Sequence, residues 1–141
     1  HEINKNNSIK KVMKYVSESE KLAFAFCSKD KPGNIYEFTQ KNPIPMDNNL
    51  HDVLKTLKVN VIHKGVIKDI LNISDEEISF TQDYSESVDA LKKGSLDLAM
   101  FLPPTTVQEV KNIADNNLFM PPKSTFFYPK ILTGLVFYKY A

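Results

Sequence analysis

The sequence predicts an α/β chain of the mixed α+β type, folded as one domain with a mixed sheet, a β-α-β unit and about four flanking helices. Short apolar runs typical of strands alternate along the chain with segments whose apolar residues recur at helical spacing. With 141 residues, of which 42% are hydrophobic, the chain is long enough to bury one core. We expect residues 1–19 to form a connector and an N-terminal helix, and residues 20–141 to form the domain.

Three segments in the first half of the chain predict helices. Apolar residues recur at helical spacing over residues 9–16, residues 50–57 and residues 59–71, and the last two segments can be continuous. Gly65 lies inside the third segment, where a glycine costs about 1 kcal/mol relative to alanine. We therefore expect Gly65 to permit a close contact between this helix and a neighbour.

A hairpin is predicted between the first two helices. Residues 22–27 form a continuous apolar run, and residues 35–39 alternate between apolar and polar side chains. The turn signal at residues 31–34 (KPGN) separates them, which indicates two antiparallel strands.

The second half of the chain predicts a β-α-β unit. Residues 78–81 and 96–102 are strand-like, residues 85–93 are helical, and Gly94 suits the C-terminal end of that helix. Two parallel strands joined by a right-handed crossover fit this order.

Two further elements follow this unit. Thr106 and Glu109 have the spacing of a capping box, in which each side chain accepts a hydrogen bond from the other residue's backbone, so a helix is expected there. The apolar and aromatic residues 135–140 predict a final strand, whose bare edge would be an aggregation risk.

The charge pattern argues against nucleic acid and membranes as partners. All 18 basic residues are lysines, they are spread along the chain, and the net charge is +1, so the basic stripe of a nucleic-acid domain is missing. The apolar runs are much shorter than a membrane span. The single cysteine, Cys27, cannot form an internal disulfide, and no signal-peptide pattern opens the sequence, so a cytoplasmic location is expected.

Familiar catalytic and cofactor motifs are missing from the sequence, so we expect no cofactor, no metal site and no turnover by this chain alone. His63 lies beside the apolar stripe of its helix, where it is either a packed histidine or a proton-transfer group. The acidic run Asp75, Glu76 and Glu77 suits a helix or turn N-terminus better than a metal site. Cys27 is expected to be an inert core thiol.

Residues 120–130 (MPPKSTFFYPK) are the densest group of unusual side chains. Prolines restrict the backbone on both sides of a cation, two hydroxyls and three aromatic rings. This pattern suits a preorganised loop for an anionic small molecule, and it equally suits a braced loop whose aromatic rings cover the sheet. The candidate ligand-binding residues are Lys123, Ser124, Thr125, Tyr128 and His63.

The same segment, followed by residues 132–136 (LTGLV), closely resembles the C-terminal signature of a bacterial family known as domain of unknown function 1015. Residues 57–63 (LKVNVIH), 78–83 (ISFTQD) and 99–104 (AMFLPP) resemble three further stretches of that family. Two positions depart from the family, since Lys58 stands where its aspartate is expected and Ile62 replaces a leucine.

The resemblance implies a protein of uncharacterised function whose N-terminal half precedes this chain. That half carries a motif like those of ParB-related nucleotide-binding proteins, some of which phosphorylate free serine. By this analogy, the domain would complete a small-molecule or nucleotide-related site that is formed mainly by the N-terminal region of the same protein. The analogy implies a phosphotransferase. The alternative is a non-catalytic interaction or dimerisation module, in which the aromatic C-terminal strand forms a homodimer.

Overall fold

A four-stranded antiparallel sheet organises the computed structural model, which describes residues 2–3 and 8–125. The strands are β1 (Glu2–Ile3), β2 (Ala23–Ser28), β3 (Ile35–Thr39) and β4 (Leu98–Phe101), in the order β1-β3-β2-β4. Helices pack against this sheet, so the predicted mixed α+β class is confirmed. The predicted hairpin is also confirmed, because β2 and β3 pair antiparallel with Phe24 opposite Phe38.

Strand β2 supplies side chains to two separate cores. Successive residues of a strand point to opposite faces, so Ala23, Ala25 and Cys27 enter one core while Phe24 enters the other. All four side chains are buried, which explains why this segment is a continuous apolar run rather than an alternating one.

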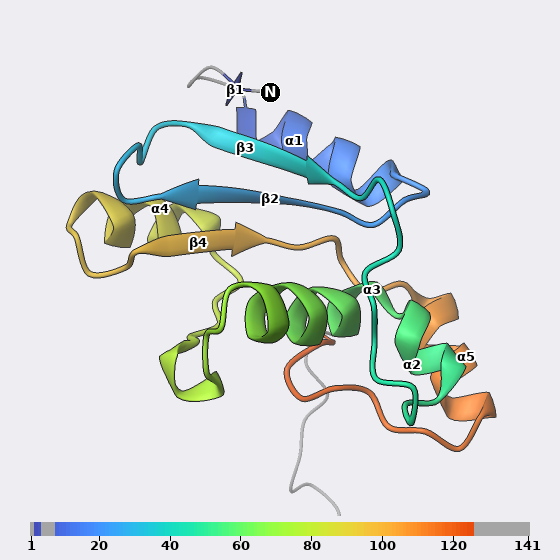
Figure 1. Cartoon of the computed structure of the whole chain (residues 1–141). Coiled ribbons are helices and arrows are strands. Elements are labelled where there is room, and N and C mark those ends of the chain that lie inside the picture. The colour runs from blue at the N-terminus through green and yellow to red at the C-terminus, as the bar shows by residue number, and fades with distance from the viewer. Residues whose placement is uncertain (1, 4–7, 126–141) are drawn as a thin grey trace, which may run out of the picture.

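Two helices cover the first face of the sheet, behind the strands in Figure 1. Helix α1 (Ser8–Glu18) places Val12 and Val16 in this core, and helix α4 (Tyr84–Lys92) adds Leu91. Because Val12 and Val16 are fully buried against β2, residues 8–18 belong to the same folded unit as the sheet.

The second face is covered by an unusual helix. The segment that predicts one helix over residues 59–71 forms α3 (Lys58–Asn60) and then the π-helix η1 (Val61–Ile70), after the short α2 (Asp52–Thr56). The backbone N–H of Leu71 donates to the carbonyl of Val66, five residues back, at 2.9 Å. Helical periodicity identifies the segment but does not distinguish this wider winding, which is rare at such length.

Gly65 of η1 makes the predicted close contact, although with a loop instead of a helix. A Cβ atom at this position would lie 2.7 Å from Cγ2 of Ile44, closer than side chains approach. The missing side chain therefore lets the segment around Ile44 pack directly against η1.

The predicted β-α-β unit is wrong in its first strand and in its strand direction. Residues 78–81 form no strand, and β4 pairs antiparallel with β2. Ile78 is half-buried against the second core, whereas Phe80 is exposed. The apolar–polar alternation of this segment therefore comes from separate contacts and not from a strand. The acidic run instead forms the 3₁₀ helix η2 (Asp75–Glu77), with Ser74 and Glu77 as a capping box.

The other predicted helix ends are confirmed. Gly94 follows α4 with a φ of +74°, the left-handed conformation that glycine adopts at a helix C-terminus. Helix α5 (Val107–Asp115) begins after Thr106, whose side chain accepts from the backbone N–H of Glu109 in the predicted capping box. The strand predicted at residues 135–140 lies outside the described residues.

Candidate functional site

His63 lies on η1 beside an acidic partner that follows the helix. Its Nε2 atom is shielded from solvent and lies 2.9 Å from Oδ1 of Asp75. With a side chain 29% exposed, His63 is neither fully packed in the core nor free in solvent, and its ligand role stays a prediction.

Asp75 of η2 contacts two side chains of η1, Lys68 and His63. Its Oδ2 atom accepts a hydrogen bond from Nζ of Lys68 at 2.6 Å, on the opposite side of the carboxylate from His63. The hydrogen bond from Lys68, and to a smaller extent His63, holds the pKa of Asp75 below its ordinary value. These contacts hold the segment that follows η1 against the helix. They also mean that the Asp75 carboxylate beside His63 is already paired with Lys68.

The proline-rich loop satisfies several of its own polar groups. The hydroxyl of Ser124 donates to the carbonyl of Pro121 at 2.6 Å, and the Ser124 carbonyl accepts from Oγ1 of Thr105 at 2.6 Å. Nζ of Lys123 lies 5.1 Å from the centroid of the Phe80 ring, a cation–π distance. Thr125 is exposed, while Tyr128 lies outside the described residues.

The structure does not join the predicted candidates into one group of contacts. His63 contacts Asp75, whereas Lys123 contacts Phe80 and Ser124 is bonded to its own loop. Cys27 is buried, and burial raises the pKa of its thiol, as expected of an inert core cysteine. Over residues 8–125, the acidic, cysteine and histidine side chains form no cluster that suits a metal ion.

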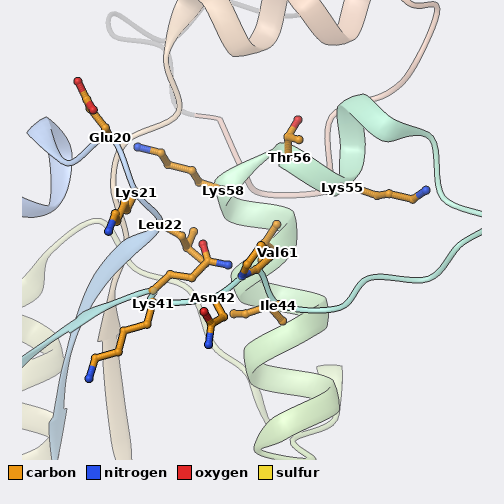
Figure 2. Close-up of a pocket in the computed structure, with 12 residues that line it drawn as sticks. Glu20, Lys21, Leu22, Lys41, Asn42, Ile44, Lys55, Thr56, Lys58 and Val61 are labelled. Carbon is orange, nitrogen blue, oxygen red and sulfur yellow. The ribbon is translucent and has the colours of Figure 1, made fainter.

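A basic pocket of about 400 Å³ opens between the start of β2, the segment after β3 and the α2–α3 corner. Figure 2 shows Leu22, Ile44 and Val61 between the start of β2 and the start of η1. Around them stand polar side chains from three separate parts of the sequence. The polar and charged members of this basic pocket are Glu20, Lys21, Gln40, Lys41, Asn42, Lys55, Thr56 and Lys58.

Two of the four lysines are fixed by neighbouring groups. Nζ of Lys58 donates to the Ser19 carbonyl at 2.8 Å, and Figure 2 shows its side chain extending toward Glu20. Nζ of Lys55 donates to Asp52 at 3.0 Å, and this bond lowers the pKa of the Asp52 carboxyl. Both lysines keep donor capacity, because an ammonium group carries three N–H bonds.

The other two lysines carry the unmatched charge. Over the described part of the chain, Lys21 and Lys41 are exposed, and their ammonium groups form neither ion pairs nor hydrogen bonds. Four lysines against one glutamate give the lining a formal charge of +3, compared with +1 for the whole sequence. The basic pocket therefore concentrates the positive charge of a nearly neutral protein.

The shape of the pocket depends on two close contacts. Gly65 admits Ile44 against η1, which sets the position of one wall. Buried Asn60 donates from Nδ2 to the Leu54 carbonyl at 2.8 Å, and this bond closes the corner that carries Lys55 and Lys58. Sequence reasoning missed the pocket because its lysines come from distant segments, and no local pattern brings such residues together.

Comparisons with family models, with curated proteins and with solved structures find no match. Among the described residues, no helix combines the length and the apolar character needed to cross a membrane.

Proposed function

We propose that this chain completes a binding site for an anionic, nucleotide-related small molecule, and that the basic pocket is its contribution. The observation that supports this proposal is the formal charge of +3 around a partly apolar base. Ammonium groups of lysine bind phosphate and carboxylate oxygens as point charges, and arginine is missing from the sequence.

The apolar base suits the organic part of such a ligand. Leu22 and Val61 are each buried, at 7% exposed, and pack in the second core with Ile44, so the apolar base is held in place by the fold. A site with an apolar base and a few placed polar groups is the usual form of a small-molecule pocket.

The remainder of the site comes from the N-terminal region that the resemblance to the domain of unknown function 1015 family implies. The basic pocket is open, so a ligand held by this chain alone keeps much of its surface in water. We therefore expect weak binding by residues 1–141, with a dissociation constant on the order of 1 mM for an inorganic diphosphate. Catalysis, including phosphotransfer, would require groups from the N-terminal region.

Calorimetric titration with pyrophosphate tests this proposal. The double variant Lys21→Ala/Lys41→Ala should bind about 10-fold more weakly, because two exposed charge contacts each contribute less than about 1 kcal/mol. The matched control is Lys10→Ala/Lys11→Ala, which removes the same charge from the exposed surface of α1. Equal losses in both variants, or no saturable binding by the wild-type chain, would reject the basic pocket as a specific site.

The alternative function is a non-catalytic interaction or dimerisation module. It is favoured by large apolar side chains that stay exposed on the described surface, chiefly Phe119 at 91%, Val107 at 82% and Ile70 at 65%. Sedimentation velocity over a concentration series separates the two functions. A mass that doubles with concentration, together with no pyrophosphate binding, would favour the module.

A further inference from the structure

The outer edge of β4 borders a groove that the proposed anion site does not use. Strand β4 is the last strand of the sheet, and within residues 2–3 and 8–125 no other strand pairs with its outer side. A groove of about 810 Å³ runs beside it, between β4 and the irregular segment that follows η2. This β4 groove is lined by apolar side chains that include Ile78, Phe80, Tyr84, Leu96, Leu98 and Met100.

The register of the sheet identifies the unpaired backbone groups. The N–H of Lys29 donates to the Asp97 carbonyl at 3.0 Å, and Cys27 lies opposite Ala99 in the same ladder. Antiparallel ladders alternate between residues that bond the neighbour and residues that face away. The backbone groups of Ala99 and Phe101 therefore face β2, while those of Leu98 and Met100 face the β4 groove.

The far wall of the β4 groove keeps aromatic surface in solvent. Phe80 is 52% exposed and Tyr84 is 42% exposed. An open strand edge beside exposed aromatic rings is the arrangement in which an added strand gains both main-chain hydrogen bonds and apolar contacts.

The last described residues lie beside this groove. Nζ of Lys123 lies 5.1 Å from the ring of Phe80, and the Thr105 hydroxyl bonds the carbonyl of Ser124 just after β4 ends. Nine residues lie between Thr125 and residue 135, and the ten extended steps that join the two positions span up to about 33 Å. Four residues of β4 extend about 13 Å, so the C-terminal segment can reach the whole edge.

The composition of the C-terminal segment matches the β4 groove. Residues 135–140 (LVFYKY) are rich in the β-branched and aromatic side chains that favour strands. The charged residues that line the groove are acidic, namely Glu77, Glu86 and Asp97. The charged side chains of residues 126–141 are Lys130 and Lys139, both cationic.

We propose that residues 135–140 of the same chain pair with the outer edge of β4 and extend the sheet to the order β1-β3-β2-β4 followed by this strand. The intramolecular segment is favoured over a second copy because its connection to Thr125 gives it a high effective concentration at the edge. The proposal is independent of the basic pocket, which lies at the opposite end of β2 from Ser28 and uses none of these residues.

Amide hydrogen exchange of the full chain tests the pairing. The amides of Leu98 and Met100 should exchange at least about 100-fold more slowly than unstructured amides. Phe137→Pro, which breaks a strand, should remove most of this protection. Ala99 and Phe101 should stay protected in the variant, because their amides face β2, and they serve as the internal control for folding. Phe119→Pro is the matched control, since Phe119 is exposed and does not line the β4 groove.

Each other outcome contradicts the proposal. Rapid exchange of Leu98 and Met100 in the wild-type chain would show an open edge. Protection that increases with protein concentration would assign the edge to a second copy. Protection that survives Phe137→Pro, or that Phe119→Pro also removes, would exclude residues 135–140 as the specific occupant.

Discussion

The proline-rich loop and the basic pocket differ in how they use their polar groups. The loop concentrates a lysine and two hydroxyls within residues 123–125, yet the Ser124 hydroxyl already bonds Pro121 and Lys123 lies over Phe80. The basic pocket collects its lysines from distant segments, and Lys21 and Lys41 have no ion-pair partner over residues 8–125. A dense group of polar residues along a sequence can therefore have its polar groups engaged within its own fold, while lysines from distant segments gather without ion-pair partners.

The backbone conformation of Lys123 is a further feature that sets the proline-rich loop apart from the basic pocket. Lys123 has a φ of +57°, a left-handed conformation that costs a side-chain-bearing residue about 1 kcal/mol. The surrounding loop must offset that cost, and the hydrogen bond from Thr105 and the cation–π contact with Phe80 contribute to doing so. Both contacts hold the loop in place against its surroundings. A ligand role for Lys123, Ser124, Thr125 and Tyr128 stays a prediction that the variants below can separate from this scaffolding.

The largest effect is expected from Gly65→Ala. The new Cβ would lie 2.7 Å from Cγ2 of Ile44, so the wall of the basic pocket must shift. Overpacking of this kind costs about 1–3 kcal/mol, against a gain of about 1 kcal/mol in helix propensity. Urea unfolding should show a net loss of stability, and pyrophosphate binding should weaken.

Gly94→Ala is the matched control for Gly65→Ala. Gly94 has a φ of +74° and no atoms that would meet an added Cβ within 4 Å, so alanine there introduces backbone strain of about 1 kcal/mol without moving the pocket. Pyrophosphate affinity should be unchanged in this variant. A more stable Gly65→Ala protein would show that Ile44 does not pack tightly on η1.

A moderate effect is expected from Thr105→Val, which removes the donor to the Ser124 carbonyl. The loss should be about 1 kcal/mol in the free energy of unfolding, since a net hydrogen bond is removed. Thr105→Ser keeps the hydroxyl and is the control. If Thr105→Val weakened pyrophosphate binding while leaving stability unchanged, the loop would be a ligand site rather than scaffolding.

Lys123→Asn should have a smaller effect on stability. It removes a cation–π contact of about 0.5–1 kcal/mol, while asparagine tolerates the left-handed backbone better than lysine does. The two changes nearly cancel, so the unfolding midpoint should barely move. A clear loss of pyrophosphate affinity in Lys123→Asn would transfer the anion site from the basic pocket to the loop.

Acid should remove a small part of the stability through Asp75. Lys68 lowers the folded-state pKa of this carboxyl below its ordinary value of 3.8, so the ion pair stabilises the fold above 3.8 and the benefit is lost as the pH falls below it. Asp75→Asn should therefore be less stable than the wild type well above pH 3.8 and equal to it at lower pH. Asp69→Asn, which removes an exposed carboxylate from the same helix, is the control.

Sequence reasoning predicted local features well and non-local ones poorly. The hairpin, the Thr106 capping box and the left-handed Gly94 follow from short-range rules, because each depends on residues within a few positions. The strand at residues 78–81 was wrong because alternation there reflects contacts with Lys123 and the second core, which are remote in sequence. The basic pocket was missed for the same reason.

The π-helical winding of η1 also has no local signal. Its apolar residues Val61, Ile62, Val66 and Ile67 fit an ordinary helical stripe, and all four are buried on the sheet. Packing of this stripe and the contact at Gly65 are properties of the assembled fold. The sequence therefore identified a helix without identifying its hydrogen-bond pattern.

Titration of pyrophosphate into the ¹⁵N-labelled chain, followed by amide chemical shifts, tests the central claim most directly. If the basic pocket is the anion site, saturable shifts will concentrate at Lys21, Lys41, Thr56 and Lys58, and Lys21→Ala/Lys41→Ala will reduce them. The amides of residues 123–125 should then move little. Saturable shifts centred on residues 123–125, or shifts that grow linearly across all lysines, would contradict the account.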